Sequence, residues 1–128
     1  MNHQIIDDRA TDDRATALSI EDFAALRASL HEQLLFRQEQ LQQLSAPATT
    51  RADARLDRQA ASQIEVRVQL AAYARMVLAD VEAALTRMDQ GHYGTCRLCR
   101  GPVGRERLMI VPQARYCARC QQVREAGR

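Results

Sequence analysis

Tryptophan and lysine are absent from this chain, and aromatic residues make up only 4% of its 128 residues. So few large side chains give a poor globular core, and they favour helices packed along a narrow seam of Leu, Val, Ile and Ala. Because lysine is missing, all 18 basic residues are arginine, which we attribute to a GC-rich genome rather than to selection for bidentate contacts. The composition therefore favours helices with a thin core.

Long apolar stretches are also missing. No run approaches the roughly 18 residues that a membrane-spanning helix needs, so no membrane partner is expected. The first nine residues are acidic and lack the basic and apolar regions of a signal peptide, and we therefore expect a cytoplasmic location. A chain of this length holds about one domain, which can be split between an extended element and a module too small to fold without a metal.

Four cysteines near the C-terminal end are the most informative residues that are present. They form two pairs with two residues inside each pair, and 17 residues separate the pairs. This spacing predicts one structural zinc ion in a tetrahedral four-thiolate site, because each pair can direct two thiolates at the same ion. The expected zinc ligands are Cys96, Cys99, Cys117 and Cys120.

Three other interpretations of the cysteines are less favoured. A two-disulfide framework requires an oxidising compartment, which the N-terminus does not indicate. A thioredoxin-like redox motif normally uses one such pair within alternating strands and helices, and the chain does not show that alternation. Thiols used only for packing would not need two matched pairs. Zinc holds its ligands deprotonated in a reducing cytoplasm, so zinc remains the preferred interpretation.

Charge is distributed unevenly along the chain. Residues 1–90 contain 10 Arg and 14 acidic residues, whereas residues 91–128 contain 8 Arg and 2 Glu. Zinc with four thiolates contributes about −2, so the C-terminal part remains basic by roughly +4. That charge favours an acidic partner but is far below the density of a dedicated DNA-binding domain.

Apolar spacing predicts two long helices. The first begins after Ser19, an N-cap candidate, and ends near Ser45; its apolar positions are Phe23, Leu26, Leu30, Leu34, Leu41 and Leu44. The second runs from about residue 52 to residue 89. Its expected seam comprises Ile64, Val68, Ala71, Arg75 and Leu78, with Val66, Leu70, Tyr73, Val77, Val81 and Leu85 beside it. Two such helices joined by a short break form an antiparallel hairpin, whose apolar stripe we interpret as the helix contact and not as a cofactor groove.

A short repeat, a proline and a glycine mark further boundaries between segments of the chain. The pentapeptide Asp-Asp-Arg-Ala-Thr occurs twice in residues 7–16, and its polar composition predicts a disordered arm to which we assign no function. Pro47 breaks the helical pattern between the two helices, and Gly91 is placed to end the second helix. The last helix is expected from about Ala118 to Ala126.

The predicted fold class is mainly α, with a long antiparallel coiled-coil hairpin, a small four-cysteine zinc finger and a short C-terminal helix. The expected parts are an arm at residues 1–18, a hairpin at 19–90 with its tip at about 46–58, and the finger with the last helix at 91–128.

The cysteine-containing segment resembles the signature of the DksA/TraR zinc-finger family, whose architecture also places a helical hairpin directly before the finger. The resemblance spans the finger almost residue by residue and covers most of residues 19–126. It rests on Gly91-His-Tyr93-Gly94-Thr-Cys96-Arg-Leu-Cys99, Gly104-Arg105-Glu106-Arg107-Leu108, Pro112-Gln-Ala114 and Cys117-Ala-Arg-Cys120-Gln121.

This resemblance implies a specific function. Members of the family bind RNA polymerase rather than promoter DNA and insert the hairpin tip through the secondary channel to regulate transcription initiation, often together with guanosine tetraphosphate. A tip pattern Asp-x-x-Asp-x-Ala occurs in the family, and Asp57 and Arg58 match its second Asp and the residue that follows it. Ala54 and Gln59 depart from that pattern, and Asp53 is the candidate to replace the missing first carboxylate.

Two further departures concern the nucleotide and the first cysteine pair. The family's site for guanosine tetraphosphate uses basic residues late in the second helix and around the finger, but residues 71–86 contain only Arg75 as a cation, so we expect little synergy with the nucleotide. Arg100 stands after the second Cys, where the family commonly has Gly, and Gly101 follows it. The knuckle is still expected to form, because a larger residue can take the left-handed turn.

The preferred hypothesis is therefore a monomeric regulator that binds RNA polymerase and is not an enzyme. No catalytic triad, phosphate-binding Gly-rich loop or carboxylate pair is evident, and His92 is expected to be a surface residue because four cysteines already complete the site. No direct sequence-specific DNA binding is expected of this regulator. The alternative is a zinc-dependent nucleic-acid-binding module. Its possible phosphate contacts are Arg97, Arg105, Arg107 and Arg119.

Overall fold

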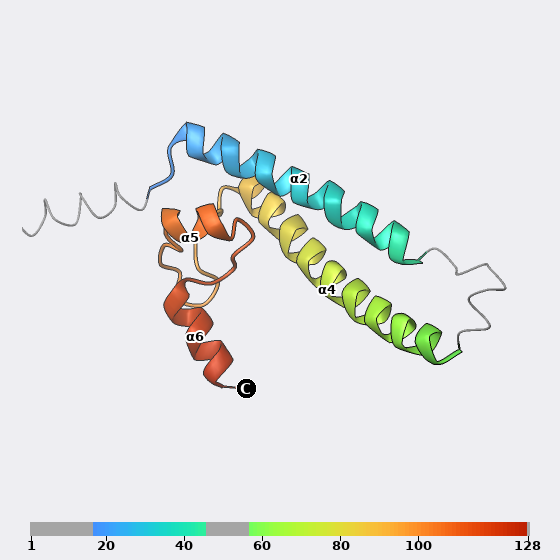
Figure 1. Ribbon diagram of the computed structural model, residues 1–128. Coiled ribbons are helices and arrows are strands. Elements are labelled where there is room, and N and C mark those ends of the chain that lie inside the picture. The colour runs from blue at the N-terminus through green and yellow to red at the C-terminus, as the bar shows by residue number, and fades with distance from the viewer. Residues whose placement is uncertain (1–16, 46–56, 128) are drawn as a thin grey trace, which may run out of the picture.

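The computed structural model describes residues 17–45 and 57–127, and the side chains of residues 57–60 are not described. The expected arm at 1–18 and tip at 46–58 therefore lie largely outside the described residues. Figure 1 shows two long helices that meet at one end, beside which a compact finger is attached. The helices are α2 (Ile20–Ser45), α4 (Asp57–Gln90), α5 (Arg105–Ile110) and α6 (Ala118–Ala126). The predicted fold class is confirmed.

The start of α2 is fixed by a reciprocal cap. The backbone N–H of Asp22 donates to Ser19 Oγ over 3.0 Å, and the backbone N–H of Ser19 donates to Asp22 Oδ2 over 3.2 Å. Two N–H groups that have no partner within the helix are satisfied in this way, which is the role of a capping box. The predicted N-cap and the predicted end at Ser45 are both confirmed.

The end of α4 is set by a left-handed glycine. Gly91 has φ 77°, its N–H donates to Met88 O over 3.3 Å, and the N–H of His92 donates to Arg87 O over 2.9 Å. This pair of bonds is the Schellman motif, in which a residue without Cβ reverses the chain at low steric cost. The motif turns the chain away from the hairpin and into the finger.

The helices contact each other through a heptad pattern at the end next to the finger, which we call the base. The seam of α2 is Leu26 and Leu30, which are buried, and the seam of α4 is Ala74, Val77, Val81, Ala84 and Met88, at alternating spacings of three and four. The prediction of Val77 and Val81 is confirmed. The predicted seam through Ile64, Val68 and Arg75 is wrong, because these side chains are exposed. Small alanines form much of the true contact surface, and a search for large apolar residues overlooks them.

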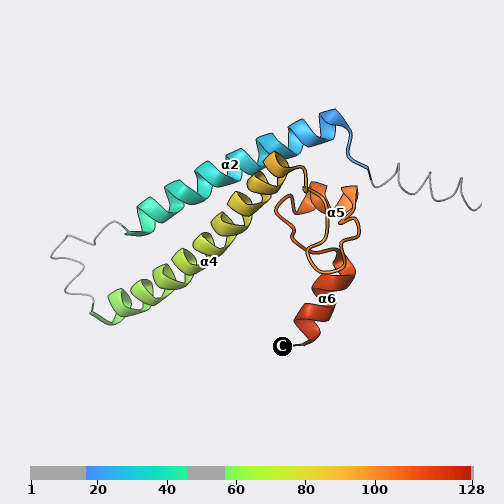
Figure 2. The same ribbon diagram turned by 180° about the vertical axis from the view of Figure 1, so that it is seen from behind.

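Away from the base the two helices diverge, as both views show (Figure 1 and Figure 2). Every side chain from residue 61 to residue 70 is exposed. Arg37 of α2 still contacts α4, since its guanidinium carbon lies 5.2 Å from the Tyr73 ring centre and 5.3 Å from the Phe36 ring centre. We call the two helices beyond this contact the outer half of the hairpin. No helix in the described ranges is long and apolar enough to cross a membrane.

The finger packs against the base through a shared core. Leu108 of α5 and Val103 are buried in the same cluster as Leu30 and Val81 of the hairpin. Tyr93 packs edge-on against the Phe23 ring, with 6.1 Å between ring centres, so it is a packing residue. Further partly buried side chains complete the cluster: Leu18, Leu34, Leu85, Val111 and Tyr116.

Candidate metal centre

The first pair of cysteines lies on a tight turn. The N–H of Cys96 donates to Gly101 O over 2.8 Å, the N–H of Arg100 donates to Cys96 O over 3.1 Å, and the N–H of Gly101 donates to Cys99 Sγ over 3.4 Å. Arg100 has φ 64°, a left-handed conformation that normally favours Gly. The expectation that a large residue takes this turn is therefore confirmed, and the turn aims both sulfurs to one side.

The second pair lies at the start of α6. Cys117 is the N-cap of this helix, and its Sγ accepts a hydrogen bond from the N–H of Cys120 over 3.5 Å. The two turns are joined directly, since the N–H of Arg97 donates to Arg115 O over 2.9 Å. A helix N-terminus suits a thiolate because the helix dipole and free N–H groups stabilise negative charge.

The four sulfur atoms fit one tetrahedral ion. The Sγ atoms of Cys96, Cys99, Cys117 and Cys120 all lie within 4.8 Å of one another, and those of Cys99 and Cys117 are 3.9 Å apart. Zinc–sulfur bonds of about 2.3 Å in a tetrahedron separate the sulfurs by about 3.8 Å, close to the observed distance. With a complete set of soft sulfur ligands and no open position, the site binds zinc as a structural cofactor.

The thiols oppose each other electrostatically when no cation is present. Burial by itself raises the pKa of Cys96. Hydrogen bonds from the backbone N–H groups of Cys99, Cys117 and Leu98 together have the larger effect and lower this pKa to about 6. The hydrogen bond with Cys117 raises the pKa of Cys120 to about 12, and burial adds to the rise. The Cys120 thiol therefore does not ionise at neutral pH by itself, and a divalent cation would hold it as a thiolate beside the other three cysteines.

Two of the four arginines proposed for phosphate contact instead form hydrogen bonds with other groups of the same chain. Arg105 donates from Nε and Nη2 to the two carboxylate oxygens of Asp22, at 2.8 and 3.0 Å. Arg107 donates from Nε to Tyr116 O over 3.0 Å. Arg97 and Arg119 are exposed, on the first cysteine turn and on α6 respectively. The candidate phosphate contacts therefore do not form one basic face of free side chains.

The tip candidates are only partly described. Asp57 and Arg58 form the first turn of α4, at the end of that helix remote from the finger, whereas Asp53 lies outside the described residues.

Sequence reasoning missed Arg87, which is only 5% exposed although it carries a charge. It lies one residue beyond the segment 71–86 that was inspected for cations, and its position directly before Met88 of the seam is the signal that could have identified it. Two ion pairs also lie in this region: Arg27 pairs with Asp89 at 2.9 Å between the two hairpin helices, and Arg115 pairs with Asp80 at 2.7 Å between finger and hairpin.

Comparison with known proteins agrees with this geometry. Residues 91–126 match the family described as the prokaryotic DksA/TraR C4-type zinc finger. A protein of Aquifex aeolicus (strain VF5), described as uncharacterized, is 36% identical over 52 residues, which are 39% of this chain and 36% of that protein. The chain thus spans about a third of the length of this relative.

The fold is also found in a solved structure. The structure of transcription factor DksA2 from Pseudomonas aeruginosa superposes with a TM-score of 0.54 and 23% sequence identity, over 81% of this chain and 78% of that chain. The class of protein that the fold and the site define is thus a helical hairpin carrying a four-cysteine zinc finger. Within this class, residues 91–126 are similar to the DksA/TraR C4-type zinc finger.

Proposed function

We propose that this protein is a transcription regulator that binds RNA polymerase and inserts its hairpin tip into the secondary channel to modulate initiation. The DksA/TraR match of the finger and the likeness of the fold to transcription factor DksA2 support this proposal. Regulation, and not catalysis, is the role that we assign to the chain.

The single observation that carries the proposal is the attachment of the finger to one end of a long hairpin. Helix α4 contains 34 residues, which at 1.5 Å per residue extend over about 51 Å. The base is held by a shared core and by the Arg105–Asp22 and Arg115–Asp80 ion pairs. A rigid base with a long projection suits a protein that reaches into a channel of its partner.

The exposed apolar side chains of the outer half support the same proposal. Val66, Leu70 and Tyr73 continue the stripe that is buried at Val77 and Val81, yet they are 54%, 43% and 52% exposed. A contiguous apolar surface of this kind marks an interaction site in a soluble protein. We assign it to contact with the polymerase, and we propose that the free chain is a monomer located in the cytoplasm.

At the tip we propose that Asp57 acts on the reaction, with Arg58 and Asp53 as neighbouring contacts. The opposing interpretation is that Asp57 only stabilises the N-terminus of α4, where the helix dipole favours a carboxylate. Most affinity should come from the hairpin and the base, whereas a charge near the catalytic centre affects turnover. Asp57→Asn should therefore leave polymerase binding within about twofold and change transcriptional output clearly.

The test combines binding and transcription. The full chain should co-purify with polymerase core without DNA, and a crosslinker at residue 57 should label the active-centre region of the polymerase. In vitro transcription at saturating protein then compares the wild type with Asp57→Asn and Asp53→Asn. Identical output from all three would show that the tip only blocks the channel, and failure to bind core would refute the proposal. Guanosine tetraphosphate is expected to add little to the effect on transcription. Ala54 and Gln59 depart from the family's tip pattern, and residues 71–86 contain only Arg75 as a cation.

A nucleic-acid-binding module remains the second candidate, supported by the basic finger. Such binding should weaken with added salt, with a log–log slope set by the number of phosphates contacted, and should survive deletion of the tip. Because Arg105 and Arg107 are engaged internally, only Arg97 and Arg119 of the original candidates are available, and the expected slope is shallow.

A further inference from the structure

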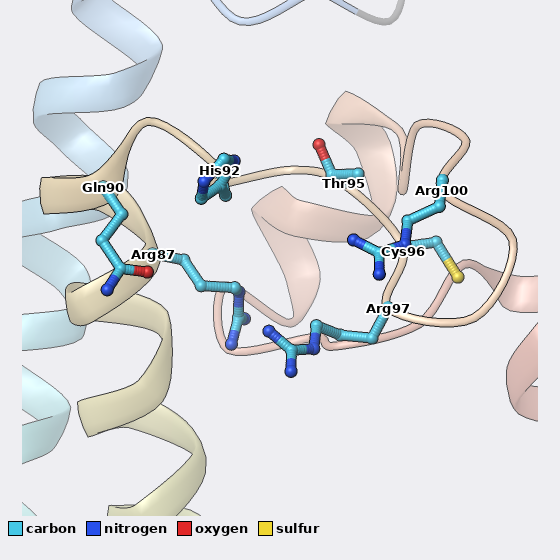
Figure 3. A pocket seen from close by; sticks show the side chains of 7 residues that line it. All are labelled: Arg87, Gln90, His92, Thr95, Cys96, Arg97 and Arg100. Carbon is cyan, nitrogen blue, oxygen red and sulfur yellow. The ribbon is translucent and has the colours of Figure 1, made fainter.

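A small cavity lies where the end of α4 meets the first cysteine turn (Figure 3). Its volume is about 100 Å³. The lining is strongly basic, since three arginines contribute to it and no carboxylate does. The lining residues are Arg87, Gln90, His92, Thr95, Cys96, Arg97 and Arg100.

Arg87 is the central residue of this cavity because it is buried without a counterion. Its side chain makes one long hydrogen bond, from Nη2 to Ala114 O at 3.4 Å, and no carboxylate in the described part of the chain lies within 4.0 Å of its guanidinium. A buried charge is costly unless it is paired and fully hydrogen-bonded. A guanidinium has five N–H donors, and the donors of Arg87 that do not reach Ala114 O remain open to solvent without a protein acceptor among the described residues.

Neighbouring charges increase that cost. Figure 3 shows the guanidinium groups of Arg87 and Arg97 directed into the same space, and the pKa of Arg87 is lowered by burial and then by the positive charges of Arg115 and Arg97. The Asp80 carboxylate offsets part of this charge, but it is itself bound by Arg115 at 2.7 Å. The cluster therefore holds excess positive charge that a bound anion would neutralise.

The zinc site is a competing explanation. Four thiolates around zinc carry about −2, and this charge attracts nearby arginines. However, the Cys96 sulfur points away from the guanidinium groups of Arg87 and Arg97 in Figure 3. The zinc–thiolate group can attract these arginines over a distance, but it does not supply the hydrogen-bond acceptors that Arg87 lacks.

We propose that Arg87, Arg97 and Arg100 bind one tetrahedral oxyanion, either inorganic phosphate or the phosphate group of a small monoester. The cavity has room for one such group, and its open side leaves the remainder of a monoester in solvent. Planar guanidinium groups match the oxygen spacing of phosphate in bidentate hydrogen bonds. His92 and Thr95 stand at the same cavity as additional donors.

The test is calorimetric titration of the zinc-loaded full chain at constant ionic strength. Inorganic phosphate and ribose 5-phosphate are compared with chloride, and zinc content is checked before and after. We expect saturable one-to-one binding of phosphate with no response to chloride. Tighter binding of ribose 5-phosphate would identify a monoester as the ligand, whereas binding of phosphate alone would identify the free ion; both results support the site.

Variants locate the site and separate it from the zinc-counterion explanation. Arg97→Gln and Arg100→Gln should each weaken phosphate binding about tenfold or more, because each removes a charge-assisted hydrogen bond. The matched control is Arg119→Gln, an exposed arginine on α6 outside the cavity, which should change the affinity less than twofold.

Three outcomes would overturn the proposal. The first is the absence of saturable binding of phosphate and of ribose 5-phosphate by the wild type, and the second is an equal loss of affinity in Arg119→Gln. The third is a pattern in which Arg97→Gln and Arg100→Gln lower zinc affinity but leave phosphate binding unchanged, because the arginines would then serve only the zinc site. Arg87→Gln adds a further measurement if it folds, but the conclusion does not depend on it.

Discussion

The base and the outer half of the hairpin use the same two helices in opposite ways. At the base Leu30 is fully buried, whereas Leu41, further along the same stripe of that helix, is only partly buried. The corresponding change in α4 occurs between Val77, which is 6% exposed, and Leu70, which is 43% exposed. The difference shows that apolar content alone does not make a coiled coil, because an apolar stripe is buried only where the partner helix stays close.

Removing zinc should produce the largest difference in stability between the base with its finger and the outer half. A chelator, or Cys117→Ser, should release one zinc ion and unfold residues 91–120, because binding of a structural metal supplies folding free energy of about 10 kcal/mol or more. Hydrogen exchange should accelerate in the finger and at the base, while amides of the outer half change little. Ala118→Ser, at a neighbouring exposed position, is the control and should keep its zinc. An equal loss of protection along the whole hairpin would contradict the division.

Truncation of leucines in α2 compares a buried position with an exposed position of the same helix. Leu30→Ala should destabilise the protein by about 3–5 kcal/mol, because it leaves a cavity in the shared core. Leu35→Ala, the same change on an exposed face, should stay within about 0.5 kcal/mol. Urea unfolding followed by circular dichroism measures both values. Similar losses in the two variants would mean that Leu35 is covered in solution.

A substitution in the first cysteine turn should make the zinc-bound finger more stable. Arg100→Gly removes the penalty of a left-handed non-glycine residue and should stabilise the zinc-bound finger by about 1 kcal/mol. Arg100→Ala is the matched control and should bring no gain, because it keeps the Cβ. Competition with a zinc-binding dye measures the difference. By the oxyanion proposal, both variants should also weaken phosphate binding.

The smallest expected effect concerns the ion pair between Asp22 and Arg105. The Arg105 side chain, and then the Ser19 backbone N–H, lower the pKa of Asp22 from 3.8 to about 2, so the contribution of this carboxylate is present above pH 4 and lost as the pH falls towards 2. A double-mutant cycle of Asp22→Asn and Arg105→Gln at pH 7 should give a coupling that shrinks with added salt. Glu21→Gln, in the same helical turn, is the control. Perfect additivity of the two variants would show that the pair contributes nothing.

The parts of the fold that depend on local chemistry could be predicted from the sequence. Ser19 and Gly91 determine helix ends through hydrogen bonds within a few residues, and the cysteine spacing determines which sulfurs meet. Helix α6 begins and ends at the predicted residues.

The parts that depend on contacts distant in sequence could not be predicted. The seam of α4 is defined by where α2 and the finger press against it, which is why Ala74 and Ala84 are buried and Ile64 and Val68 are not. Arg87 is buried for the same reason, since the finger covers it and only the folded chain brings Ala114 and Arg97 to its side. Helical periodicity alone carries no record of either contact.

The absence of tryptophan gives the three tyrosines a further use as intrinsic optical reporters of separate regions. Tyr73 lies beside Arg37 where the helices diverge, Tyr93 lies at the junction, and Tyr116 lies in the finger under the Arg124 guanidinium. The Tyr93 hydroxyl donates to Pro112 O over 2.8 Å, and burial raises its pKa to about 12. The stabilising contribution of the neutral Tyr93 hydroxyl is therefore complete below pH 10 and lost as the pH rises towards 12. The ultraviolet absorption change on ionisation of Tyr93 thus reports, without any label, when the finger detaches from the hairpin.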